Sequence, residues 1–231
     1  MSLNFTTTDK ASNAHGVKCL VYGGAGSGKT TLCGTAPSPL IISAEAGLLS
    51  LRSKAIPVIT IVNDKDLEEA LNWCRTDAIK NGIKTVCLDS ISEIVEQILK
   101  TEKSKTKDPR AAYGEMATRA LQIVKDFRDL SGLHVLITAK QVVATDPITG
   151  VAKAIPTAPG QQVGPALPYL FDLVMHAYTD KAPDGTTYHA LRTHAAFNAE
   201  AKDRSGALDE IEWPDLSNII TKVQAVPQPA Q

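Results

Sequence analysis

A glycine-rich segment near the amino terminus has the residue types and spacing of a phosphate-binding loop, or P-loop. Its sequence GGAGSGKT matches G-x-x-x-x-G-K-[ST] at every fixed position. The glycines permit a tight turn whose backbone N–H groups point at phosphate oxygens, while Lys29 reaches the β- and γ-phosphates and the Thr30 hydroxyl ligates Mg²⁺. The sequence therefore predicts binding of ATP and Mg²⁺. The predicted nucleotide-binding residues are Gly23, Gly24, Ala25, Gly26, Ser27, Gly28, Lys29, Thr30 and Thr31.

Two carboxylates follow apolar runs further along the chain. Glu45 comes directly after the run 39–44, and Asp89 after the run 84–88. The carboxyl ends of parallel strands meet at the edge of the sheet that carries a P-loop, so both side chains are expected beside the nucleotide. Glu45 is predicted to orient and deprotonate the attacking water, with a solvated surface turn as its alternative. Asp89 is predicted to lie on the metal side, opposite Thr30.

A third buried run, 133–139, ends at Lys140 and Gln141. A polar residue at this exit can sense the γ-phosphate and move the segment that follows, and the sequence leaves open which of the two does so. The segment 142–163 contains the turn signals Asp-Pro and Thr-Gly and a cation, Lys153. Its length predicts a functional loop.

The surrounding pattern predicts an α/β fold with a mostly parallel central sheet and helices on both faces. Apolar runs alternate with segments of helical periodicity, such as 91–99 and 116–130. In the last third, the runs 171–178 and 187–193 flank an Asp-Gly pair and predict an antiparallel hairpin. We expect an arm over 1–16, an ATPase core over 17–224 and a tail without folding signal over 225–231.

Composition limits the partners of this chain. The 231 residues carry a net charge of -1, which argues against a generally basic nucleic-acid coat and leaves room for a local basic contact. The four cysteines form no C-x-x-C pair, which favours a reducing cytoplasm. No apolar run approaches the roughly 18 residues of a membrane span, and 1–16 has no apolar signal region, so neither membrane insertion nor secretion is expected.

The segment 100–113 carries an excess of basic residues. As a solvated charged loop it would have no ligand; as a functional loop it would contact a phosphate backbone and stack an aromatic ring on bases. Spacing alone favours neither interpretation. The candidate contacts are Lys103, Lys105, Lys107, Arg110 and Tyr113.

The order of the P-loop, the strands ending at Glu45 and Asp89, the strand leading to Lys140 and Gln141, and the hairpin resembles the RecA recombinase core. It is most similar to small phage-encoded, core-only RecA-like recombinases and single-strand annealing proteins. The resemblance implies a RecA-like ATPase with Glu45 as the catalytic glutamate and Asp89 as the Walker B aspartate. It also implies that 103–113 and 142–163 are the two DNA-binding loops.

Assembly is a further implication of the resemblance. Lys202 and Arg204 look like the paired cations that reach a neighbour's ATP across a filament interface, and Phe5 resembles the aromatic residue of a polymerisation tether. The expected function is an ATPase that binds single-stranded DNA and assembles head to tail, as a filament or a ring. A single-strand DNA-binding protein would be a further partner. The alternatives are a helicase-like ring motor and a nucleotide-gated binding protein with little hydrolysis.

Overall fold

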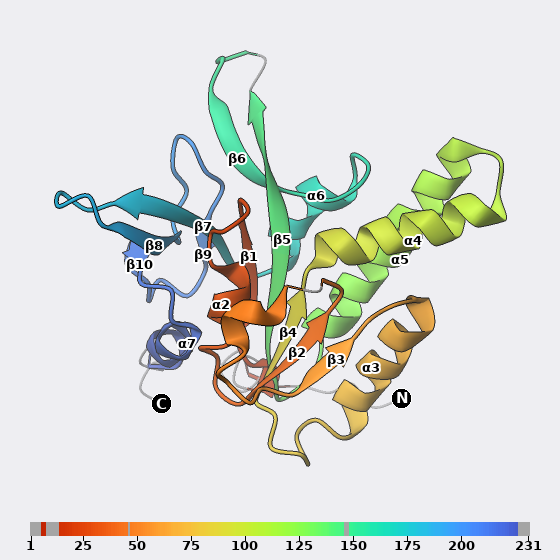
Figure 1. Cartoon of the computed structure of the whole chain (residues 1–231), viewed down its shortest axis with the longest axis horizontal. Coiled ribbons are helices and arrows are strands. Elements are labelled where there is room, and N and C mark those ends of the chain that lie inside the picture. Colours follow the sequence, from red (N-terminus) through yellow and green to blue (C-terminus); the bar gives the residue numbers. More distant parts are fainter. Residues whose placement is uncertain (1–5, 8–13, 46, 146–147, 226–231) are drawn as a thin grey trace.

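The computed structural model describes residues 6–7, 14–45, 47–145 and 148–225. Within these residues ten strands form one sheet, whose main path runs β10-β8-β7-β1-β5-β4-β2-β3 (Figure 1). The strands are β1 Lys18–Gly23, β2 Pro39–Ser43, β3 Val58–Thr60, β4 Thr85–Asp89, β5 His134–Thr145, β6 Ala152–Thr157, β7 Leu173–Lys181, β8 Thr187–Arg192, β9 Lys202–Asp203 and β10 Ile211–Glu212. The helices are α2 Lys29–Cys33, α3 Asp64–Thr76, α4 Ile91–Lys105, α5 Pro109–Arg128, α6 Val163–Ala166 and α7 Leu216–Gln224, with short 3-10 helices η1 Leu48–Leu51 and η2 Leu167–Leu170.

Six neighbouring strands, from β3 through β2, β4, β5 and β1 to β7, are parallel. Strands β7 and β8 form the expected antiparallel hairpin, whose turn contains Gly185 at φ 83°. The chain leaves β1 for β2, which lies on the far side of β5 and β4. In such parallel sheets ligands bind outside the carboxyl ends of the strands, where the strand order reverses. The mostly parallel sheet and the carboxyl-terminal antiparallel hairpin predicted from the sequence are thus confirmed.

Helices cover both faces of the sheet because successive side chains of a strand point to opposite faces. Leu20 and Val86 pack with α3, α4 and α5, whereas Val21 and Cys87 pack with α2 and α7. The strands buried on both sides therefore read as continuous apolar runs, as parallel strands do. None of the described helices is long and apolar enough to cross a membrane.

Residues 103–113 were predicted to form a DNA-binding loop, and the prediction of a loop is wrong because most of these residues are helical. Two helices, α4 and α5, lie side by side and are joined by residues 106–108 (Figure 1). The Asp108 side chain accepts a hydrogen bond from the backbone N–H of Arg110 at 2.9 Å, and Pro109 is the first helical residue. An aspartate followed by proline starts a helix efficiently. Lys103 and Lys105 consequently lie in the last turn of α4, Arg110 and Tyr113 in the first turns of α5, and Lys107 in the connection.

The prediction of a long loop over 142–163 also requires correction. Strand β5 continues to Thr145 and pairs with β6 in an antiparallel hairpin, from Lys140 opposite Thr157 to Thr145 opposite Ala152. The hairpin projects beyond the edge of the sheet (Figure 1). Its β-branched residues favour a strand, and Gly150 at φ 69° belongs to the turn. Lys153 therefore lies on β6, and residues 158–162 form an irregular connection between β6 and α6.

The two terminal predictions fall largely outside the described residues. Phe5, the candidate tether residue, and residues 226–231 of the predicted tail are outside the described residues. The described core elements run from Lys18 to Gln224.

Candidate functional site: the nucleotide edge of the sheet

The P-loop joins the end of β1 to the start of α2. Gly26 and Gly28 have φ angles of 75° and 89°, a backbone conformation that residues other than glycine rarely adopt. The Lys29 ammonium donates hydrogen bonds to the carbonyl oxygens of Gly23 and Gly24 at 2.9 and 2.8 Å, so it folds back over the loop. Burial lowers the pKa of Lys29, while the negative charges of Asp89 and Glu45 act in the opposite direction. The loop thus places a cation beside the turn, as phosphate binding requires.

Asp89, at the end of β4, is 3% exposed and is held by two threonine hydroxyls. Thr30 Oγ1 donates to Asp89 Oδ2 at 2.7 Å, and Thr138 Oγ1 donates to Asp89 Oδ1. Thr138 lies on β5, the strand between β4 and β1, and is fully buried. The structure therefore places the two predicted metal-side residues in contact and adds a third residue. A polar residue inside the apolar run 133–139 was the available signal for Thr138.

The oxygen atoms of Thr30 and Asp89 fit Mg²⁺, which prefers hard oxygen ligands. No group of three or more His, Cys, Asp or Glu side chains in the described chain forms a self-contained metal site.

Glu45 lies beside Asp89, because Ser43 on β2 pairs with Asp89 on β4. The Glu45 carboxylate accepts a hydrogen bond from the Ser90 hydroxyl, 2.6 Å from Ser90 Oγ to Glu45 Oε1. Ser90 also caps α4, since its Oγ accepts from the backbone N–H of Glu93. Ser90 follows the predicted aspartate directly, yet its partner lies 45 residues away and could not be recognised from spacing. The result is a carboxylate at the nucleotide edge, where it can accept a proton from water.

Lys140 and Gln141 point to different surroundings. Lys140 forms ion pairs with Glu93 and Glu96 of α4, and its hydrogen bond to Glu93 raises the pKa of Lys140. Gln141 lies at the P-loop: its Nε2 is 3.6 Å from the position that a Cβ on Gly24 would occupy. Between the two predicted sensors, Gln141 is the one that the fold places beside the nucleotide loop.

A family model described as an AAA domain matches residues 15–205. The chain belongs to this AAA domain family. A solved KaiC-like protein from the hyperthermophilic archaeon Pyrococcus horikoshii is similar over 77% of each chain, with 13% identity and a TM-score of 0.40. No curated protein matches the chain. The family match spans the P-loop, Glu45, Asp89 and Gln141, so the candidate nucleotide site lies within this AAA domain.

The two cations predicted to act on a neighbouring subunit lie away from this AAA domain's own P-loop. Strand β9 pairs with the first residues of β7, and Gly23 pairs with Ala177 further along the same strand. Lys202 Nζ donates to the carbonyl oxygen of Pro168 at 2.6 Å, and Arg204 is 3.2 Å from the Asp172 carboxylate. Both cations thus have partners within the chain near the start of β7, and action across an interface stays a prediction.

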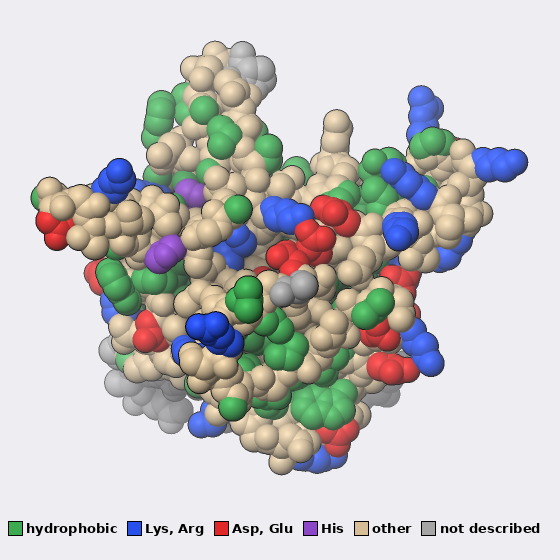
Figure 2. All heavy atoms as spheres, viewed as in Figure 1, with side chains coloured by type: hydrophobic (Ala, Val, Ile, Leu, Met, Phe, Trp, Pro, Cys, Tyr) green, Lys and Arg blue, Asp and Glu red, His purple; other side chains and the backbone are tan. Residues whose placement is uncertain are grey.

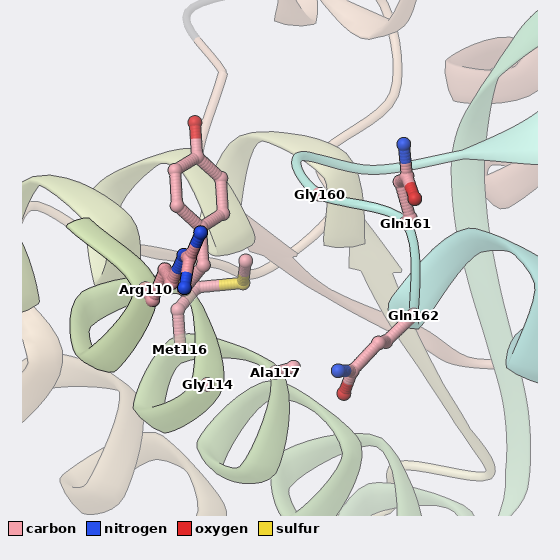
Figure 3. A pocket seen from close by; sticks show the side chains of 8 residues that line it. Arg110, Gly114, Met116, Ala117, Gly160, Gln161 and Gln162 are labelled. Atoms are coloured by element: carbon pink, nitrogen blue, oxygen red, sulfur yellow. The ribbon is translucent and has the colours of Figure 1, made fainter.

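The two segments predicted to bind DNA meet at a cavity of about 370 Å³ (Figure 3). One wall is the start of α5 and the other is the segment before α6, from which the labelled side chains of Gln161 and Gln162 extend. The lining residues are Arg110, Tyr113, Gly114, Met116, Ala117, Gly160, Gln161 and Gln162. Figure 2 shows Lys and Arg side chains gathered over the projecting end of the α4–α5 hairpin. The DNA-binding candidates Arg110 and Tyr113 thus line the same cavity as residues 160–162. The candidate Lys153 lies elsewhere, on the β5–β6 hairpin.

Proposed function

We propose that this AAA domain is a phage-type recombinase or annealing ATPase that binds single-stranded DNA and assembles head to tail, with ATP between protomers. The observation that carries the DNA-binding part is the cavity with the basic helical hairpin beside it. A chain of net charge -1 needs a local basic surface to bind a polyanion, and the end of α4–α5 supplies one.

The chemistry of this surface fits a single strand. Lys103 lies with its Nζ 5.2 Å from the centroid of the Tyr113 ring, and the Tyr113 side chain is 39% exposed. An exposed aromatic ring stacks on bases without regard to sequence, and neighbouring cations contact phosphates. Lys105, Lys107 and Arg110 extend the charge along the hairpin.

Hydrolysis follows from the residues at the nucleotide edge. Thr30 and Asp89 would hold Mg²⁺, which when bound neutralises charge on the phosphate oxygens. Lys29 exchanges its bonds to backbone carbonyls for phosphate oxygens, and Glu45 takes a proton from the attacking water. Gln141 would contact the terminal phosphate, and the short distance of 3.6 Å from its Nε2 to the position of a Cβ on Gly24 supports this role.

Assembly is proposed to complete the site. Lys202 and Arg204 of one protomer would leave their present partners and neutralise charge at the next protomer's ATP, as an arginine finger does. Phe5 would tether neighbouring protomers. Mixing Lys202→Ala protein with Glu45→Gln protein tests this, because interfaces that combine an intact cation with an intact glutamate should recover turnover. Absence of any recovery would contradict action across the interface.

The central experiment measures ATP hydrolysis with and without single-stranded DNA, together with electron microscopy in a non-hydrolysable ATP analogue. DNA-stimulated turnover and DNA-dependent helical filaments are expected. A closed ring that moves along DNA without annealing would instead support the ring motor. If Glu45→Gln leaves function intact, the chain is a nucleotide-gated binding protein. Turnover indifferent to DNA, without DNA-dependent assembly, would overturn the proposal.

Charge variants locate the DNA surface. Replacing Lys103, Lys105 and Lys107 by alanine should reduce the slope of log affinity against log salt concentration by about 2, given roughly 0.7 per phosphate contact on a single strand. The matched control replaces the exposed Lys65, Lys80 and Lys84, which lie on or after α3, and should leave that slope unchanged. Equal effects of the two triple variants would show that net charge, and not this hairpin, determines DNA affinity.

A further inference from the structure

We propose that His176 is a positioning residue that turns the donor end of the Gln141 amide toward the terminal phosphate of the nucleotide. This inference rests on ATP binding at the P-loop, and it does not depend on DNA binding. His176 was not among the candidates from the sequence, where it reads as an ordinary strand residue.

Strand order brings the two residues together. Strand β1 lies between β5 and β7, and Tyr22, directly before the P-loop, pairs with His176 on β7. Gly23 pairs with Lys140 on the other side, so Gln141 lies just beyond the end of β1. The side chains of His176 and Gln141 meet there, with 2.9 Å between His176 Nε2 and Gln141 Oε1.

When the proton of the neutral imidazole is on Nε2, this contact determines which end of the Gln141 amide faces the P-loop. A glutamine amide has an accepting oxygen at one end and a donating NH₂ group at the other. With Oε1 accepting from the Nε2–H of His176, the NH₂ group is the end that faces Gly24, at 3.6 Å from that residue's Cβ position. Phosphate oxygens accept hydrogen bonds, so this orientation is the productive one. The reversed amide would direct a partial negative charge at the phosphate.

Stacking holds the imidazole in place. Its ring centroid lies 5.1 Å from that of Tyr22 and 5.7 Å from that of Tyr178, at interplanar angles of 25° and 20°. Tyr22 is in turn fully buried, with its Oη 3.0 Å from the carbonyl oxygen of Ala154 on β6 and 2.5 Å from that of Glu200. His176 is therefore fixed by the same packing that anchors the β5–β6 hairpin, and rotation of its ring away from Gln141 is opposed.

The test compares two substitutions that separate the hydrogen bond from the packing. His176→Phe keeps a ring that can stack between the tyrosines and removes the N–H donor. His176→Gln offers an amide donor at a similar reach. Binding of ADP and of a non-hydrolysable ATP analogue is measured for each, and the ratio of the two dissociation constants reports contact with the terminal phosphate.

His176→Phe should lower the preference for the ATP analogue roughly tenfold, the equivalent of one hydrogen bond to a charged group, with little change in ADP affinity. His176→Gln should restore most of the preference, and the exposed control His194→Phe should retain all of it. Equal weakening of both nucleotides, or an unchanged ratio, would overturn the inference.

A double-mutant cycle provides the second measurement. If His176 acts through Gln141, then Gln141→Leu should reduce the ratio by a similar factor, and the double variant should lose no more than either single variant. Additive losses would contradict the inference. Because the readout is nucleotide discrimination, a failure of DNA stimulation would refute the proposed function while leaving this inference standing.

Discussion

Replacing Thr138 by valine isolates the hydrogen bond that Thr138 donates to the Asp89 carboxylate. Valine has nearly the shape of threonine, so the core around β5 keeps its packing while Asp89 Oδ1 loses its donor. Thr138 is fully buried and Asp89 is 3% exposed, so water cannot replace the lost hydroxyl without rearrangement. The bond from Thr30 to Asp89 Oδ2 remains.

The expected loss in stability follows from the charge of the acceptor. A hydrogen bond to an ionised group contributes about 1.5–3 kcal/mol, and each kcal/mol shifts the melting temperature of a chain of this size by about 2–4 °C. The Thr138→Val variant should therefore melt roughly 3–12 °C below the wild type. Its half-saturating Mg²⁺ concentration for ATP turnover should rise, because the carboxylate proposed to bind Mg²⁺ would be less well oriented.

The assay is thermal denaturation of the nucleotide-free protein, followed by a Mg²⁺ titration of hydrolysis. Thr138→Ser is the control: it retains the hydroxyl, and although loss of a buried methyl group lowers stability by about 1 kcal/mol, its Mg²⁺ dependence should remain that of the wild type. If the valine variant matches the wild type in both melting temperature and Mg²⁺ dependence, the assigned role of Thr138 is wrong.

Two further predictions concern β1. Gly23→Ala should abolish nucleotide binding measured by calorimetry, because the added Cβ would lie 2.3 Å from the backbone oxygen of Ala177; wild-type affinity would contradict this close approach. Lys18 is buried with its ammonium bonded to the carbonyls of Leu130 and Leu133, and burial lowers the pKa of Lys18 to about 8. The pKa of lysine in the unfolded chain is about 10.4, so as the pH rises the native state loses this proton before the unfolded state does. Between pH 7.5 and 10.5 the free energy of unfolding of the wild type should therefore rise by up to about 3 kcal/mol relative to that of Lys18→Met. Urea unfolding of both proteins checks the difference, and a difference independent of pH would refute the assignment.

Local signals in the chain were sufficient for the fold class and for the P-loop. A P-loop is a contiguous turn, so its residues are recognisable from their order, and buried parallel strands read as uninterrupted apolar runs. The same runs located Asp89 at the end of β4 and predicted the β7–β8 hairpin through its Asp-Gly turn. Each of these features depends on residues that are neighbours along the chain.

Two local interpretations were wrong for the same kind of reason. The segments 103–113 and 142–157 are polar or interrupted by turn residues, which favoured loops. Packing of α4 against α5, and pairing of β5 with β6, extended regular structure into both segments. Tertiary contacts outweighed weak local preferences there.

The partners of the site residues depended on strand order. With β1 between β5 and β7, Gln141 and His176 approach each other across the end of β1, although 35 residues separate them. Thr138 reaches Asp89 because β5 lies beside β4. The choice between Lys140 and Gln141 was likewise open in the sequence, since adjacent residues of a strand point to opposite faces and their surroundings are set by distant segments. Residue types and spacing therefore indicated the candidate catalytic groups, whereas the packing of distant strands determined which side chains hold them in place.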